Sequence, residues 1–208
     1  VYILLLRALE ELDNRKNLLT VMRLAEVMIL RRRIVGRPTG TDEKRIFAKT
    51  TSIEFDKPDV LEAIKSRFTE HTPSRGEFKT SVQTESFKRS DRTRYVLDML
   101  ERHGFDPGGM SKVRTLGDVD IEHIAPRRMT ADKYTNWVEY LDIDAEEFER
   151  KYRDRIGNLT LLESGANRSN RNDLFEEKVS DYEESTFLIS NNLADSGEWS
   201  IDKIESRS

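Results

Sequence analysis

The sequence predicts an α+β protein that is mostly α-helical, and two patterns support this fold class. Apolar residues recur at three- and four-residue spacing through the first hundred positions, as they do on the buried face of a helix. Two short apolar runs, near 119–124 and 159–162, favour strands instead. With 36% hydrophobic residues, the chain is long enough to bury a substantial core.

The first half of the chain favours a succession of helices. In chain order, these lie near 4–12, 18–33, 44–49, 60–68, 78–82 and 95–100. Gly36 and Pro38 end the second of them. Asp59 is a candidate cap for the fourth, and Gly104 ends the sixth.

A change of pattern in the middle of the chain predicts two parts. Residues 105–111 contain Pro107 and two glycines and form the clearest linker. We therefore expect a helical subdomain over 1–110 and a second unit over 111–208. A polar connecting segment, 127–155, lies between the two predicted strands of the second unit. Predicted helices in this unit lie near 137–141, 148–152, 175–182 and 187–193, with a closing element at 199–204.

Composition excludes several classes of function. A formal net charge of −4 gives no general affinity for nucleic acids, so any DNA site needs a local basic surface. The absence of cysteine excludes disulfides, thiol catalysis and cysteine-bound zinc, and it fits a bacterial cytoplasm. The sequence contains no P-loop motif for nucleotides.

The apolar opening, Val1–Leu6, is too short to span a membrane and has no features of a signal peptide. We expect a core helix there and no membrane partner. Because the chain does not begin with methionine, we interpret it as a fragment of a longer protein.

The segment Asp-Val-Asp-Ile-Glu-His-Ile-Ala-Pro at 118–126 contains the residues best suited to catalysis. The unperturbed pKa of histidine, about 6.5, allows His123 to accept a proton from water at neutral pH. Glu122 offers a carboxylate to a metal ion. Neighbouring strand residues point to opposite faces, so both can reach one site only if the backbone turns there. Pro126 supports such a turn.

Phosphodiester hydrolysis needs an activated water, neutralised phosphate charge and help for the leaving oxygen. One Mg²⁺ or Mn²⁺ ion can supply the last two, and such hard ions prefer oxygen ligands. Glu122 is the predicted carboxylate ligand and Asn167 the predicted amide ligand. Asn170 takes the amide role if the following helix begins later, and Asn172 is a third candidate. Any one of these asparagines can also simply cap the helix.

Three further segments extend this pattern: Ile-Gly-Asn-Leu-Thr-Leu-Leu at 156–162, the Asn-rich run 167–172 and Phe-x-x-Lys at 175–178. Together with 118–126, they resemble the HNH-like (ββα-metal) C-terminal nuclease domain of the GmrSD family of modification-dependent restriction enzymes. The C-terminal domain of SspE-type proteins, which act in phosphorothioation-dependent phage defence, is similar.

The resemblance extends beyond these motifs to nearly the whole chain. Leu-Arg-Arg-Arg-Ile-Val-Gly at 30–36 and Lys-Arg-Ile-Phe-Ala at 44–48 look like the helical region that precedes the nuclease unit in this family. Trp199–Arg207 resembles its closing tryptophan-then-helix element.

The resemblance implies a ββα-metal nuclease unit over 111–208, packed on the helical subdomain. His123 matches the general base and Glu122 the metal-binding acid. Asn167 matches the ligand at the helix start, with Asn170 as its competitor. Asn158 matches the asparagine that ties the second strand to the loop and orients the base.

The resemblance also implies an activity and partners. The chain would be a metal-dependent endonuclease that nicks double-stranded DNA, as the effector of bacterial anti-phage defence or modification-dependent restriction. An N-terminal domain outside these residues would hydrolyse nucleotide and sense the modified DNA.

Basic residues near the motifs are candidates for phosphate contacts. They are Arg127, Arg128, Arg168, Arg171 and Lys178. The alternative is a salt-bridged surface, because several acidic residues lie between them. Arg31–Arg33 have three possible roles: a second DNA-binding surface, a face that docks another domain, or buried ion pairs.

Two alternatives compete with DNA cleavage. The chain can be a non-catalytic module that binds DNA or a partner and keeps an HNH-like scaffold; its net negative charge favours this. It can also hydrolyse RNA, because the metal and base chemistry would be similar.

Overall fold

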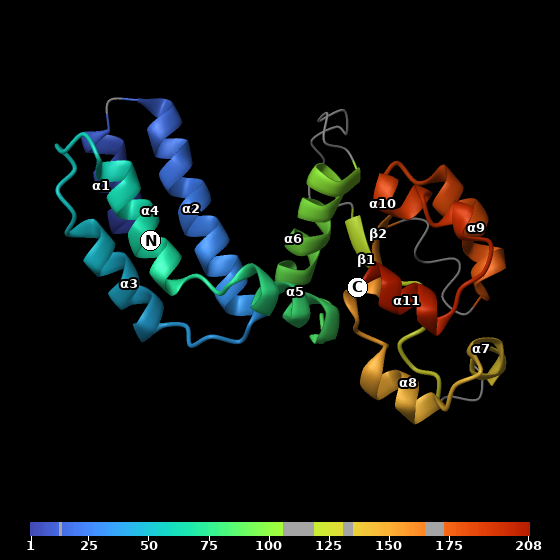
Figure 1. Ribbon diagram of the computed structural model, residues 1–208. Coiled ribbons are helices and arrows are strands. Elements are labelled where there is room, and N and C mark those ends of the chain that lie inside the picture. Colours follow the sequence, from blue (N-terminus) through green and yellow to red (C-terminus); the bar gives the residue numbers. More distant parts are fainter. Residues whose placement is uncertain (13, 106–118, 131–134, 165–172) are drawn as a thin grey trace. The chain divides into compact units, whose positions relative to one another are not determined.

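The structure is a computed structural model that describes residues 1–12, 14–105, 119–130, 135–164 and 173–208 (Figure 1). It divides into two compact units, Val1–Val82 and Gln83–Ser208. The predicted fold class is confirmed, because the chain is mostly helical and contains a small two-stranded sheet. Among the described residues, no helix has the length and apolar character needed to cross a membrane.

The first unit is built from helices. They are α1 (Tyr2–Glu11), α2 (Arg15–Ile34), α3 (Thr41–Thr51) and α4 (Val60–His71), followed by α5 (Arg75–Thr84), which extends across the boundary. Helices α1 to α4 pack against one another around a core that includes Leu4, Met28, Ile64 and Phe68. Within a helix the core residues recur at helical spacing, as Ile64 and Phe68 do in α4, so each amphipathic helix buries its apolar face.

Polar details of the first unit refine the sequence-based expectations. Arg32 is buried and forms an ion pair with Asp42, so this arginine has the ion-pair role rather than a DNA-binding one. Arg33 pairs with Glu43 at 3.4 Å. Asp59 occupies the N-cap position of α4, but its side chain makes no capping hydrogen bond there.

The second unit contains the sheet and its surrounding helices. In chain order, its elements are α6 (Asp91–Leu100), the π-helix η1 (Glu101–Phe105), β1 (Val119–His123), α7 (Thr135–Leu141), α8 (Ala145–Lys151), the 3₁₀ turn η4 (Ile156–Asn158), β2 (Leu159–Glu163), α9 (Phe175–Glu184), α10 (Leu188–Asn191), the 3₁₀ turn η6 (Ala194–Ser196) and α11 (Ile201–Arg207). All of the helices that the sequence predicts after residue 135 occur, with shifted ends.

The boundary between the compact units lies before α6, whereas the sequence places it at 110/111. Helix α6 contacts both strands. The buried carboxylate of Glu101 accepts hydrogen bonds from the backbone N–H groups of Leu188 and Ile189, at 3.0 and 2.8 Å, at the start of α10. These contacts join residues 83–105 to the strands and to α10. Most of the predicted linker lies outside the described residues.

Strands β1 and β2 pair antiparallel, with His123 opposite Leu159 and Glu122 opposite Thr160. Along β1, buried and half-buried residues alternate, because successive side chains of a strand point to opposite faces. The pairing stays regular through His123. Therefore Glu122 and His123 face opposite sides of the sheet, and the expected turn between them does not occur.

The last helix closes against the residue that begins the Gly-Asn-Leu motif. A Cβ atom at Gly157 would lie 2.0 Å from the carbonyl oxygen of Ile204, so no larger residue fits while α11 stays in place. Arg207 donates a hydrogen bond to the Gly157 carbonyl at 2.5 Å, and its guanidinium lies over the ring of Trp199. Trp199 in turn stacks on Phe175. Helix α11 is thereby fixed to the start of β2.

Candidate active site

Asn158 joins the two strands at the end nearest His123. Its side chain is completely buried. The amide oxygen accepts a hydrogen bond from the Ala125 N–H at 2.9 Å, and Nδ2 donates to the carbonyl of Ala125 at 3.1 Å. Its backbone carbonyl accepts from Ile124 at 3.0 Å. The side chain and the backbone of Asn158 therefore both hold the loop that follows His123 to the beginning of β2.

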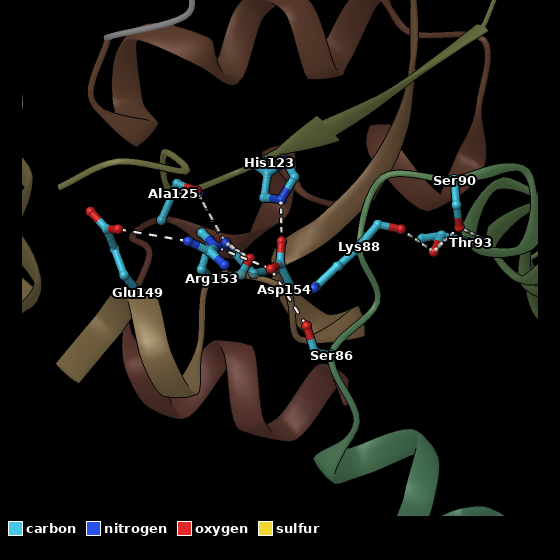
Figure 2. A network of polar contacts seen from close by, with 10 residues as sticks. Ser86, Lys88, Ser90, Thr93, His123, Ala125, Glu149, Arg153 and Asp154 are labelled. Carbon is cyan, nitrogen blue, oxygen red and sulfur yellow. Dashed lines mark hydrogen bonds and ion pairs between the residues drawn. The ribbon is translucent and has the colours of Figure 1, made fainter. Parts of the chain in front are cut away.

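His123, the last residue of β1, points at Asp154 (Figure 2). The distance from Nε2 to Oδ1 is 3.1 Å, and the two side chains are only 6% and 7% exposed. Asp154 lies in the segment that links α8 to η4. Two residues far apart in sequence thus form a buried imidazole–carboxylate pair.

Burial favours the neutral form of the His123 imidazole, and hydrogen bonds favour the ionised form of the Asp154 carboxylate. Burial lowers the pKa of His123, and the charge of Arg127 lowers it further, although Asp154 and Glu122 oppose this shift. Burial raises the pKa of Asp154, but hydrogen bonds from His123 and Arg153 outweigh that effect and lower it below its usual value. His123 is therefore able to accept a proton at neutral pH.

Several groups fix Asp154 in place (Figure 2). The Arg153 Nε donates to Oδ2 at 3.0 Å, and the Ser86 hydroxyl donates to the same oxygen at 3.5 Å. The backbone carbonyl of Asp154 accepts from Phe87 N–H at 2.6 Å. Glu149 pairs with Arg153 at 3.7 Å on its other side. The carboxylate that faces His123 is thus part of an extended polar network.

On the other face of β1, Glu122 forms a buried ion pair. The Lys178 ammonium, from α9, donates to Glu122 Oε1 at 2.8 Å. It also donates to the backbone carbonyls of His123 and Ile124, at 3.4 and 3.1 Å, and lies 5.9 Å from the ring centre of Trp137. Lys178 is only 3% exposed. Its ammonium already has three acceptors, which leaves it no donor for a phosphate.

The described residues do not fit a divalent ion well. Glu122 already faces an ammonium group, and Asp154 faces His123 and an arginine. A divalent cation next to either carboxylate would be repelled by those positive charges or would have to displace them. In the part of the chain that the structure describes, no group of three or more His, Asp and Glu side chains is arranged to hold a metal.

The other predicted site residues divide into two groups. Arg127 and Arg128 are exposed and directly follow the His123 loop, so both are accessible to a polyanion. The predicted metal ligands Asn167 and Asn170, their competitor Asn172, and the arginines 168 and 171 lie outside the described residues. Their roles stay predictions.

Asp154 and Arg153 are site residues that the sequence does not reveal. Arg-Asp-Arg at 153–155 is the kind of charged run that usually lies on a solvated surface. Only the tertiary fold brings it to His123. The one available signal is its position just before the Ile-Gly-Asn motif, which has to return to the His123 loop.

The sequence model of the family described as GmrSD restriction endonucleases, C-terminal domain, matches residues 72–208, more than half of the chain. The chain belongs to this family, as its motifs predicted. No curated protein matches the sequence. Membership makes this a restriction-endonuclease type of domain, and such domains typically use divalent metals. The match begins at residue 72, so the likeness of the earlier helical segments to the family stays a prediction.

Proposed function

We propose that this chain is the DNA-cleaving effector domain of a modification-dependent restriction protein in bacterial anti-phage defence, with His123 as general base. The observation that supports this most directly is the buried contact of 3.1 Å between the His123 imidazole, at the end of β1, and the Asp154 carboxylate, together with the burial that lowers the pKa of His123. A base of this kind has a proton-accepting nitrogen at neutral pH. Family membership supplies the reaction class.

The proposed reaction is hydrolysis of a phosphodiester bond. His123 takes a proton from a water molecule while the water oxygen attacks phosphorus and forms a new P–O bond. The P–O bond to the leaving sugar oxygen breaks, and that oxygen takes up a proton from solvent. Arg127 and Arg128, exposed beside the base, are proposed to hold substrate phosphates. One such site cuts one strand at a time, so nicking is the expected outcome.

The proposal includes a requirement for one divalent ion, Mg²⁺ or Mn²⁺, which follows from the family rather than from the described donors. Double-stranded DNA is the proposed substrate. An N-terminal domain that hydrolyses nucleotide and senses modified DNA is the proposed partner, and the bacterial cytoplasm is the proposed location.

A supercoiled-plasmid assay tests the proposal. Wild type, His123→Ala and His103→Ala are compared with Mg²⁺, with Mn²⁺ and with EDTA. His103 is an exposed histidine of the same unit and serves as the matched control. We expect wild type and His103→Ala to convert the plasmid to open circle only with metal. His123→Ala should be slower by about 10²–10⁴-fold, the usual contribution of a general base.

Full activity in His123→Ala would reject His123 as the base. Equal conversion in EDTA would reject the metal requirement. Structured RNA in a parallel reaction decides between the two nucleic acids, and faster cleavage of RNA would replace the proposed substrate.

The ion pair between Glu122 and Lys178 favours a second candidate function, a non-catalytic DNA- or partner-binding module on the same scaffold. In that case the predicted metal carboxylate serves only to hold β1 against α9. This candidate predicts DNA binding that EDTA leaves unchanged, together with no plasmid nicking at any metal concentration.

A further inference from the structure

We propose that Asp154 is the positioning residue for His123, and that it makes Nδ1 the nitrogen that takes the proton from water. This inference rests on the proposed nuclease function of the same site. It adds the orientation of the base and identifies a residue that neither the motifs nor the family description singles out.

The contact between the two side chains determines which nitrogen carries the hydrogen. An ionised carboxylate can only accept hydrogen bonds, so the Nε2 atom, 3.1 Å from Asp154 Oδ1, has to be the donor. A neutral imidazole has a single N–H group. With the hydrogen on Nε2, Nδ1 keeps its lone pair. No described residue forms a hydrogen bond with Nδ1.

The Asp154 carboxylate and the backbone beside it are held by several hydrogen bonds. Its second oxygen accepts from Arg153 and Ser86, and the backbone on either side is fixed. The Asp154 carbonyl accepts from Phe87, and the Arg153 carbonyl accepts from Asn158 Nδ2 at 2.9 Å. Asn158 also binds the loop after His123. The same asparagine therefore sets the positions of both members of the pair.

Such fixation matters because catalysis by a base depends on its direction as well as its basicity. A His123 ring without Asp154 could rotate or place its hydrogen on Nδ1, and either change would remove the lone pair that the proposal assigns to the attacking water. Arg153 contributes by keeping Asp154 ionised in a buried position. A purely structural Asp154 would support the fold without imposing a tautomer.

The first test is the tautomer of His123 in the wild-type protein, measured by ¹⁵N NMR with labelled histidine. The chain has only three histidines, so His123→Gln assigns the signal unambiguously. At neutral pH we expect the Nε2–H form to predominate. An Nδ1–H form or an even mixture in the folded wild type would overturn the inference, and this measurement needs no altered Asp154.

The second test compares Asp154→Asn with Asp120→Asn. Asp120 is a β1 carboxylate that pairs with Arg89 at 2.9 Å and does not contact His123, so it controls for loss of an ion pair in the same sheet. In Asp154→Asn we expect a shift toward the Nδ1–H form and a fall in kcat of about 10²–10⁴-fold, with KM nearly unchanged. Asp120→Asn should keep the wild-type tautomer and kcat.

The outcomes separate this inference from the proposed function. A wild-type tautomer and kcat in folded Asp154→Asn would overturn the positioning role, while His123→Ala would still test the nuclease. If wild type cleaves nothing, the Nε2–H form in wild type and its loss in Asp154→Asn would support the positioning role alone. If Asp154→Asn is unfolded by circular dichroism, the wild-type tautomer decides.

Discussion

Two neighbouring residues on opposite faces of β1, His123 and Glu122, have partners of opposite charge. On one face, His123 meets the Asp154 carboxylate, and burial lowers the pKa of its imidazole. On the other face, Glu122 meets an ammonium group that also holds two backbone carbonyls. The difference teaches that adjacency in a catalytic motif does not place two side chains in one site. Strand geometry separates them, and each then acquires its own partner.

The comparison makes the two faces separable by experiment. Changes on the His123 face should mainly affect catalysis, whereas changes on the Glu122 face should mainly affect stability. A buried ion pair contributes little net stability compared with well-packed apolar residues, but removal of one partner leaves an uncompensated buried charge.

The largest effect on stability is expected from Lys178→Met. This change leaves the Glu122 carboxylate and the His123 and Ile124 carbonyls without their donor, so the free energy of unfolding should fall by about 3–5 kcal/mol. Urea denaturation measures it. The double variant Glu122→Gln/Lys178→Met should lose less than the sum of the two single changes, because no buried charge remains.

The single variant Glu122→Gln tests most directly whether the two faces of β1 have separate roles. If Glu122→Gln abolishes plasmid nicking while the urea midpoint stays at the wild-type value, then Glu122 acts as a metal ligand, as the motif suggests. The separation of the two faces would then be wrong.

An intermediate effect on stability is expected from Asn158→Ala, because Asn158 binds the loop after β1 to the beginning of β2. The substitution removes the acceptor for the Ala125 N–H and the donor to two carbonyls. A buried polar group left without a partner costs about 1–3 kcal/mol. Thermal unfolding followed by circular dichroism measures the loss. A variant as stable as wild type would show that water replaces the amide and that the Asn158 contacts are dispensable for stability.

The smallest effect is expected from Asp144→Ala, on the His123 side of the unit. The Asp144 side chain accepts from the Glu147 N–H at 2.9 Å and caps α8, the helix that leads to Asp154. Loss of such a cap costs about 1 kcal/mol. Differential scanning calorimetry of Asp144→Ala beside Asp144→Asn, which keeps the capping oxygen, tests this. Equal losses in both variants would rule out capping as the cause.

Local pattern predicts much of this fold, and it fails where partners come from distant segments. The strands at 119–123 and 159–163 follow from short apolar runs, and α9 follows from helical spacing. The two strands pair antiparallel, and Asn158 binds the loop that follows β1. These features depend on residues within each segment or on one recognisable motif.

The pairs around β1 have no such local signal. Asp154 lies in a charged run that resembles a surface, and Lys178 resembles an exposed basic residue of an acidic helix. Each is buried against a partner more than thirty residues away in the sequence, Asp154 against His123 and Lys178 against Glu122. The sequence assigned Glu122 to a metal because it sits beside His123, and only the regular strand shows that the two diverge.

The close approach of Gly157 to Ile204 affects the order in which the protein can mature. The start of β2 rests on α11, and Arg207 and Ser208 both bind Gly157, through its carbonyl oxygen and its N–H respectively. During synthesis, the strand that opposes His123 is therefore made before residues 201–208. The packing of β2 on α11 can be completed only after residues 201–208 have left the ribosome, so the candidate site takes its final shape after this segment has been made.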